Sequence, residues 1–307
     1  MAKDQNFNVK TISITMVKNE DDIIESFVRH NLNFVDMMII ADNMSTDNTL
    51  KILTNIREEG LPIEIKIDDK QDYSQGDKIS KLYWHAANNY AFSKVFFLDA
   101  DEFLVENQPQ SSFDGHPGEV YTLNRFNYDI IDLQNAEKDI VKKIVHIGKQ
   151  VTSKSMLFHS PSAYHHYHIG MGSHKIRYHK KIIDNGIHPG FWIAHFPWRS
   201  KKQFLSKSIL GYLAVLLASP TPEFGIHWQN AFEFICSKQM DLSDDDFLNY
   251  VYKYRLSPNW MDKLRHEPLP CSYVMKYQDL ISTTNLLFSV VAAYVKTIST
   301  YWDMRNN

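Results

Sequence analysis

Two aspartates separated by one residue follow a short apolar run near residue 100. The run is Val95–Leu98, and Asp99, Ala100 and Asp101 come directly after it. Residues two positions apart in an extended backbone point to the same side, so both carboxylates are expected to face one site. Oxygen ligands without a neighbouring cysteine favour Mg²⁺ or Mn²⁺, which keep waters and bind substrate phosphates. The pair therefore predicts a divalent-metal site for a phosphorylated ligand, with Asp99 and Asp101 as ligands.

Acidic residues also follow the other apolar runs of the first hundred residues. Glu20 follows one run, Asp42 the next, and Asp69 the third. The runs themselves are typical of strands and comprise Thr11–Val17, Met37–Ala41 and Ile63–Ile67. In open parallel sheets ligands bind outside the carboxyl ends of the strands. We therefore expect these acids to converge on one crevice, where a cation would relieve their mutual repulsion.

The segments between the strands show helical spacing of apolar residues. Asn19 is expected to cap the first helix, and Glu20 to lie in its first turn. Further helices are expected from Ser45 to Gly60 and around 79–90. Such strand and helix alternation predicts right-handed βαβ units. The fold class is therefore α/β, with a Rossmann-like, mostly parallel sheet flanked by helices.

The regularity fades beyond about residue 105. Glu119–Phe126 is typical of another strand, whereas 158–198 is rich in His, Tyr and Gly and has no clear period. Beyond Arg199 the sequence favours helices, with a break at 219–222, a helix opened at Ser243 and a last helix near 285–300. We predict one domain over residues 1–200, which contains the acidic crevice, and a mainly helical extension over 201–307.

Composition excludes several classes of protein. With 33 Lys and Arg against 36 Asp and Glu, the net charge of -3 gives no field that would hold a nucleic-acid backbone. The two cysteines lie far apart without a CxxC pattern, as expected in a reducing compartment. The polar N-terminus lacks the apolar core of a signal peptide. The longest apolar runs, 209–218 and 286–295, are shorter than the roughly 20 residues that a membrane span requires. A cytoplasmic protein is predicted.

Two phosphate-binding motifs are absent. The sequence contains neither G-x-G-x-x-G nor G-x-x-x-x-G-K-[ST], so no glycine-rich turn cradles phosphate with backbone amides. A metal ion and side chains must therefore balance any phosphate charge.

Three motifs resemble family 2-type glycosyltransferases of the GT-A fold in order and spacing. They are Val17-Lys18-Asn19-Glu20, the segment from Ala41 to Asp47, and the segment from Phe97 to Phe103; the resemblance covers about residues 10–105. His195-Phe-Pro-Trp-Arg-Ser200, with Gln203 and Lys207, resembles one bacterial branch of that family. Asn43 and Met44 depart from the usual Asp and Gly, and no Glu-Asp base motif or Gln-x-x-Arg-Trp is present.

The resemblance implies that residues 1–200 form a GT-A domain that binds a nucleotide sugar and carries out catalysis. UDP-sugars are favoured as donors. It implies that Asp42 contacts the nucleoside, that Asp69 contacts the base, and that Asp99 and Asp101 bind metal and ribose. The residues expected to bind the donor are Val17, Asn19, Glu20, Asp42, Asp69, Lys78, Asp99, Ala100, Arg199 and Gln203. The metal is expected to be Mn²⁺ or Mg²⁺, held by Asp99 and Asp101, with His195 as a further candidate ligand.

The proton acceptor is left open between Asp129, Asp184 and His195. A histidine suits either role because imidazole titrates near neutral pH and binds metals, although any single histidine is more often structural. Arg199 is a candidate for neutralising the leaving diphosphate, since arginine recognises phosphate through paired hydrogen bonds. The alternative is that Arg199 only lies at the solvent-exposed start of a helix. Trp192, Trp198 and Trp228 are candidates for stacking on sugar rings, with core packing as the alternative.

Together these features predict a metal-dependent, inverting glycosyltransferase. Its acceptor would be a hydroxyl of a glycan or glycolipid, as in bacterial lipopolysaccharide or other cell-surface polysaccharide synthesis, with possible peripheral contact at the inner membrane. Two alternatives remain. One is a protein that binds nucleotide sugars without turnover. The other is a metal-dependent phosphoester hydrolase, in which His and Asp ligands would pair at strand ends.

Overall fold

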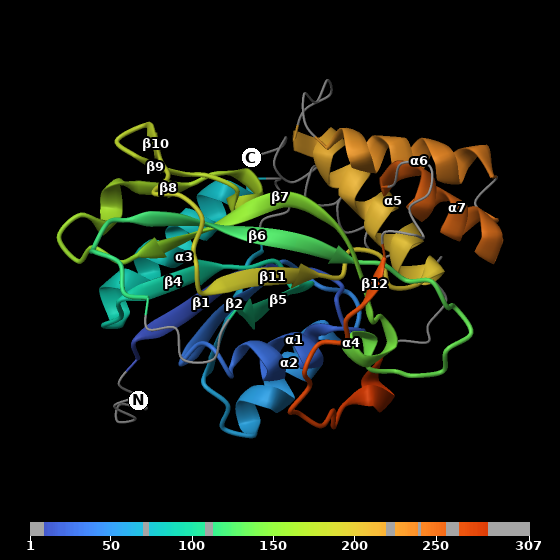
Figure 1. Ribbon diagram of the computed structural model, residues 1–307, viewed down its shortest axis with the longest axis horizontal. Helices are drawn as coiled ribbons and strands as arrows, with labels where there is room; N and C mark the ends of the chain where they lie inside the picture. The colour runs from blue at the N-terminus through green and yellow to red at the C-terminus, as the bar shows by residue number, and fades with distance from the viewer. Residues whose placement is uncertain are drawn as a thin grey trace.

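The computed structural model describes residues 9–69, 74–107, 113–218, 225–238, 241–255 and 264–281. Within them, a nine-stranded sheet forms the centre of the molecule (Figure 1). Its strands are β1 (Thr11–Val17), β2 (Met37–Asp42), β3 (Ile63–Ile67), β4 (Lys94–Phe97), β5 (Glu102–Glu106), β6 (Val120–Tyr128), β7 (His146–Phe158), β11 (Phe191–His195) and β12 (Arg265–His266). The helices are α1 (Ile24–Asn31), α2 (Thr49–Glu58), α3 (Gln75–Asn89), α4 (Ile140–Lys143), α5 (Lys201–Ala218), α6 (Ile226–Ser237) and α7 (Asp244–Arg255).

The first four strands form the parallel part of the sheet. Their order is β3-β2-β1-β4, and every pair within it is parallel. The register sets the end of β1 beside the end of β2, with Val17 opposite Asp42. The predicted α/β class, with helices between parallel strands, is confirmed. The carboxyl ends of these strands lie at one edge, where the acidic turns follow.

Alternation along the strands gives the sheet two buried faces. On β4, Phe96 packs with the apolar side chains of α1 and α2, whereas Val95 and Phe97 pack with those of α3. A strand whose side chains are buried on both sides has the continuous apolar character seen in Val95–Leu98. The sheet therefore lies between two layers of helices, and its central strands are held rigidly.

The sheet continues beyond β4 with mixed directions. The order there is β4-β7-β6-β11-β5, in which β6 and β11 are parallel and the other pairs are antiparallel. A separate three-stranded sheet, formed by β8 (Tyr167–Ile169), β9 (Ile176–Tyr178) and β10 (Lys181–Ile183), packs beside α3. This second half is where the sequence showed no clear period.

The helices α5, α6 and α7 group at one end of the sheet (Figure 1). They confirm the helical character predicted for this part of the chain, including the helix after Ser243. The predicted break at 219–222 and the last helix near 285–300 lie outside the described residues. Among the helices that the structure describes, none combines the length and the apolar character that crossing a membrane requires.

A buried histidine makes the stability of this fold depend on pH. His188 is 3% exposed, and its Nδ1 accepts hydrogen bonds from the backbone N–H groups of Gly190 (3.0 Å) and Phe191 (3.2 Å). Burial and the nearby Lys94 lower the pKa of His188 from 6.5 to about 4. Between these pH values the unfolded chain binds a proton that the folded chain does not. Stability is therefore lost as the pH falls through this window.

We expect the free energy of unfolding to decrease from pH 7 to pH 5, and to decrease less in the His188→Asn variant. The Asn side-chain oxygen can accept the same backbone hydrogen bonds but does not titrate in this range. Urea unfolding of both proteins at the two pH values measures the difference. An equal pH dependence in the two proteins would contradict the role assigned to His188.

Candidate functional site

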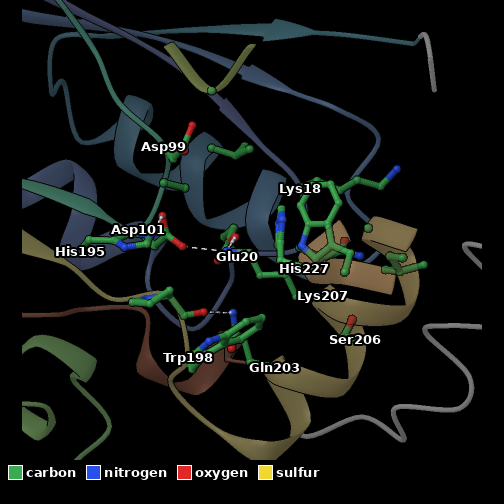
Figure 2. A pocket seen from close by; sticks show the side chains of 18 of the residues that line it. Lys18, Glu20, Asp99, Asp101, His195, Trp198, Gln203, Ser206, Lys207 and His227 are labelled. Carbon is green, nitrogen blue, oxygen red and sulfur yellow. Dashed lines mark hydrogen bonds and ion pairs between the residues drawn. The ribbon is translucent and has the colours of Figure 1, made fainter. Parts of the chain in front are cut away.

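A cavity of about 1030 Å³ lies at the carboxyl ends of β1 and β4. The turns after these strands form one wall, and α5 and α6 form the opposite wall. Figure 2 shows Asp99, Asp101 and His195 on one side of the cavity and Ser206 and His227 on the other, and Lys207 of α5 reaches Asp101 with its Nζ at 2.7 Å. The cavity is therefore built jointly by the parallel sheet and the helical part of the chain.

The turn after β1 is tied to the turn after β2. Asn19 has a positive φ of 56°, and its Oδ1 accepts a hydrogen bond from the backbone N–H of Thr46 (2.7 Å). The backbone N–H of Glu20 donates to Thr49 Oγ1 (2.8 Å). The prediction that Asn19 caps the first helix is wrong, because α1 begins only at Ile24 and its cap position is Ile23. Asn19 instead fixes both turns at the rim of the cavity.

Asp101 lies at the centre of a group of charged side chains. It is 3% exposed, and its Oδ2 is 2.7 Å from Lys207 Nζ and 3.8 Å from an Arg199 nitrogen. His195 Nε2 is 3.6 Å from Asp101 Oδ1. Burial by itself raises the pKa of a carboxyl group, but Lys207, His195 and Arg199 outweigh it and hold the pKa of Asp101 well below its usual range. Asp101 is thus a permanent negative charge at the cavity wall.

Arg199 lies beneath this group and is fully buried. Its guanidinium pairs with Glu20 and forms two hydrogen bonds of 2.9 Å with the carboxylate of Asp22. Arg199 does not line the cavity. It fixes the turn after β1 to the start of α5, and it does not occupy the diphosphate-binding position predicted from the sequence.

Lys207 is the cation of this group that lines the cavity. Its side chain is 29% exposed, and it also lies 3.2 Å from Glu20 Oε1. Burial lowers the pKa of an ammonium group, but Asp101 and Glu20 more than offset this and raise the pKa of Lys207. Lys207 is therefore charged at neutral pH and presents a cation to the cavity.

Asp99 belongs to a second charged group. Its Oδ2 is 2.5 Å from Nζ of Lys154, a lysine on β7 with no exposed surface, and Lys154 also lies 3.3 Å from Glu102. Glu102 pairs in turn with Arg125 on β6 (2.5 Å). Asp99 itself is 35% exposed and points away from Asp101 in Figure 2. The two aspartates of the motif therefore face different partners. The expectation that both carboxylates face one site is wrong, because the backbone at Ala100 and Asp101 is a turn and is not extended.

The residues around Asp101 fit a divalent ion held by two protein ligands. His195 Nδ1 lies 2.7 Å from Asn127 Oδ1, which can only accept, so Nδ1 carries the proton. When His195 is protonated, its Nε2–H faces Asp101 Oδ1, and this is the form that lowers the pKa of Asp101. In the neutral ring Nε2 instead presents its lone pair towards that oxygen. Two electron-rich atoms facing each other suit a cation between them, and Mg²⁺ and Mn²⁺ complete their shells with waters and phosphates. No group of three or more metal-binding His, Cys, Asp or Glu side chains occurs among the described residues.

The predicted site residues divide into two sets by position. Those that line the cavity are Val17, Asn19, Glu20, Asp99, Ala100, Asp101, His195 and Gln203. Those that do not are Asp42, Asp69, Lys78, Asp129, Asp184 and Arg199.

Three predicted donor-binding residues outside the cavity are buried, paired or exposed elsewhere. Asp42 is buried at the end of β2 and accepts a hydrogen bond from the backbone N–H of Ser45 (3.1 Å). Lys78 pairs with Asp68 (2.8 Å), and Asp69 is exposed. In place of Asp42, the next residue along the turn, Asn43, lines the cavity.

The two acidic base candidates are also placed elsewhere. Asp129 is buried against Gly148, where even a Cβ atom would lie 2.3 Å from its Oδ2. Asp184 is exposed and accepts a hydrogen bond from the backbone N–H of Gly186 (2.9 Å). Their positions suit roles in local structure, and neither side chain reaches the cavity.

Several cavity residues were not among the predicted site residues. Lys207 follows Gln203 by four positions on α5, and the same helical face continues to Gly211 and Ala214, all in the cavity wall. The motif around His195 includes both Gln203 and Lys207, but no role was predicted for Lys207, although helical spacing places it on the same face as Gln203. Lys154 and Asn127 lie on strands that no motif marked, so only the packing of the sheet brings them to Asp99 and His195.

Comparisons with known proteins give matches only among solved structures; no family model and no curated protein matches the chain. One match is the mannosyltransferase PcManGT from Pyrobaculum calidifontis in complex with GDP-Man and Mn²⁺, at 15% identity, 38% of this chain, 36% of that chain and a TM-score of 0.29. Another is S. aureus TarS 1-349 in complex with UDP, at 11% identity, with 76% of this chain and 72% of that chain covered and a TM-score of 0.33. A third is glucosyl-3-phosphoglycerate synthase from Mycobacterium tuberculosis in complex with Mn²⁺ and UDP, at 18% identity, with 39% of this chain and 44% of that chain covered and a TM-score of 0.25. The chain thus spans about a third of the length of the mannosyltransferase.

Proposed function

We propose that the protein is a GT-A-type glycosyltransferase that moves a sugar from a nucleotide-sugar donor to a hydroxyl of a glycan or glycolipid. The observation that carries this proposal is the meeting of Asp101, His195 and Lys207 in one cavity at the carboxyl ends of the parallel strands. A permanently ionised carboxylate, an imidazole and a charged lysine in one place suit the binding of a metal ion and a diphosphate. UDP is the favoured nucleotide, on the motif resemblance.

In this proposal Asp101 and His195 hold Mg²⁺ or Mn²⁺, and Asp99 binds the donor. The ion, when bound, neutralises charge on the diphosphate. The acceptor hydroxyl gives its proton to a general base as its oxygen forms a bond to the anomeric carbon, and the bond from that carbon to the phosphate oxygen breaks. The electron pair leaves with the nucleoside diphosphate, whose charge Lys207 stabilises. Displacement from the opposite side inverts the configuration at that carbon.

The turns after β1 and β2 place the donor. Asn19 fixes the two turns to each other, and Val17, Glu20 and Asn43 line the same end of the cavity. Arg199, with Glu20 and Asp22, anchors this end to α5. We further propose a cytoplasmic enzyme, with peripheral contact at the inner membrane, whose product belongs to lipopolysaccharide or another surface glycan. We also propose that the catalytic domain spans residues 1–200 and the helical extension spans 201–307. Residues of both parts then line the donor site.

Release of nucleotide from UDP-, GDP- and CMP-sugars, with Mn²⁺ or with chelator, tests the proposal. We expect metal-dependent release from one donor class, increased by a glycan acceptor. Nucleotide binding without release would favour a non-catalytic binding protein. Hydrolysis of simple phosphoesters without use of any nucleotide sugar would favour a phosphoester hydrolase. Either result would overturn the proposed function.

A further inference from the structure

The helical wall of the cavity has its own composition. Along α5, Ser206, Leu210, Gly211 and Ala214 face the cavity, and Trp228 of α6 lies next to them. Beyond Lys202 and Lys207, which lie nearer the start of α5, this part of the wall is largely apolar and uncharged, in contrast to the charged wall formed by the strand ends. A cavity with one charged end and one aromatic end suits a ligand with a phosphorylated part and an uncharged ring.

Two glycines bring an aromatic ring onto this wall. A Cβ atom on Gly211 would lie 2.7 Å from the indole of Trp228, so the ring rests directly on the backbone of α5. Gly225, with φ of 76°, begins the turn into α6, and a Cβ atom there would lie 2.7 Å from Val215. Both close approaches require the absence of a side chain. The helices are thus arranged to present the indole at the cavity wall.

His227 stands beside this ring. The two ring centroids are 4.7 Å apart, and His227 lines the cavity on the side of Ser206, opposite Asp101 (Figure 2). Four acids of the charged wall pair with cations of the protein. Asp101 pairs with Lys207, Asp99 with Lys154, and Glu20 and Asp22 with Arg199. Imidazole takes up a proton near neutral pH, which suits a proton acceptor.

We propose that the α5 and α6 wall is the acceptor subsite, that Trp228 supports a pyranose ring of the acceptor, and that His227 is its general base. The inference rests on the proposed function. The proton of the acceptor hydroxyl goes to His227 as the oxygen bonds to the anomeric carbon, and the phosphate oxygen leaves with the electron pair of the broken bond. The apolar face of a sugar ring packs on an indole, and Ser206 supplies a hydroxyl beside it.

Saturation-transfer NMR with methyl glucopyranoside, galactopyranoside and mannopyranoside tests the subsite. The protein is saturated with UDP and Mg²⁺ so that the donor end is filled. We expect at least one glycoside to bind, and Trp228→Ala and Gly211→Ala to weaken its binding by about tenfold or more. Trp84→Ala, which truncates a tryptophan outside the cavity, is the control and should bind as wild type. Binding of none of the glycosides, or unchanged binding to Trp228→Ala, would overturn the subsite.

Nucleotide release separates this inference from the proposed function. We expect His227→Asn to lower the rate of release in the presence of the bound glycoside by about 10²-fold or more, with UDP affinity unchanged. A rate within about threefold of wild type would overturn the role of His227. Failure of the wild-type protein to release nucleotide from any donor would instead contradict the proposed function. Glycoside binding would then still report on the subsite alone.

Discussion

Asp101→Asn is expected to lower kcat for sugar transfer by about 10³-fold. Asn keeps the size of the side chain but removes the charge that faces His195 and Lys207. In the proposed site this weakens metal binding and releases Lys207 from its 2.7 Å ion pair, so the groups that stabilise the leaving diphosphate are no longer held in place. Steady-state kinetics with the preferred donor measures the effect.

Asp184→Asn is the matched control for this variant. Asp184 is an exposed aspartate outside the cavity, so its loss is expected to change kcat by less than about twofold. Both variants should be assayed well below their unfolding midpoints. A kcat for Asp101→Asn within about tenfold of wild type would contradict the central position given to Asp101.

Arg199→Met is expected to cause the largest loss of stability among the site residues. The substitution leaves the carboxylates of Glu20 and Asp22 at the same place without the guanidinium that joins them. Removing one partner of a buried ion pair costs about 3–5 kcal/mol. For a chain of this size that corresponds to a decrease in Tm of roughly 10 °C. Thermal unfolding followed by circular dichroism measures it.

Two further variants sharpen this prediction. Arg199→Lys keeps the charge but cannot make the paired hydrogen bonds to Asp22, so its Tm should fall between those of wild type and Arg199→Met. Arg57→Met, on the exposed side of α2, should leave Tm nearly unchanged. A small loss in Arg199→Met, equal to that of Arg57→Met, would show that Arg199 does not hold the turn after β1 to α5.

The parallel part of the fold could be predicted because local sequence determines it. Thr11–Val17 and Ile63–Ile67 are strands with the predicted bounds. The first is a β-rich run that is mostly buried, whereas the second is an edge strand in which Ile alternates with Glu and Lys. The turn at Asp99 to Asp101 could be placed because it follows the buried apolar run Val95–Leu98. Among β5 to β12, only β6 was predicted, as Glu119–Phe126. The others gave little signal, because antiparallel pairing between distant segments depends on contacts that no local period encodes.

The orientation of individual side chains was harder to predict from the sequence. The sequence placed Asp42 at a strand end correctly, but whether its carboxylate faces the cavity depends on the turn at Ser45, and the carboxylate turns inwards. Arg199 was predicted at the diphosphate because arginine suits phosphate. Arg199 is instead buried in an ion pair with Asp22, which could not be predicted because the two residues lie far apart in the sequence. Lys154, likewise, meets Asp99 only through the pairing of β7 with β4.

The most direct test of the account is the binding of UDP and GDP by isothermal titration calorimetry, with and without Mn²⁺. If Asp101 and His195 hold the ion that contacts the diphosphate, Mn²⁺ should tighten binding of one nucleotide, and linkage requires that nucleotide to tighten Mn²⁺ binding by the same factor. This coupling should disappear in Asp101→Asn and persist in Asp184→Asn. Equal nucleotide affinity with and without Mn²⁺, or full coupling in Asp101→Asn, would contradict the proposed metal and donor site.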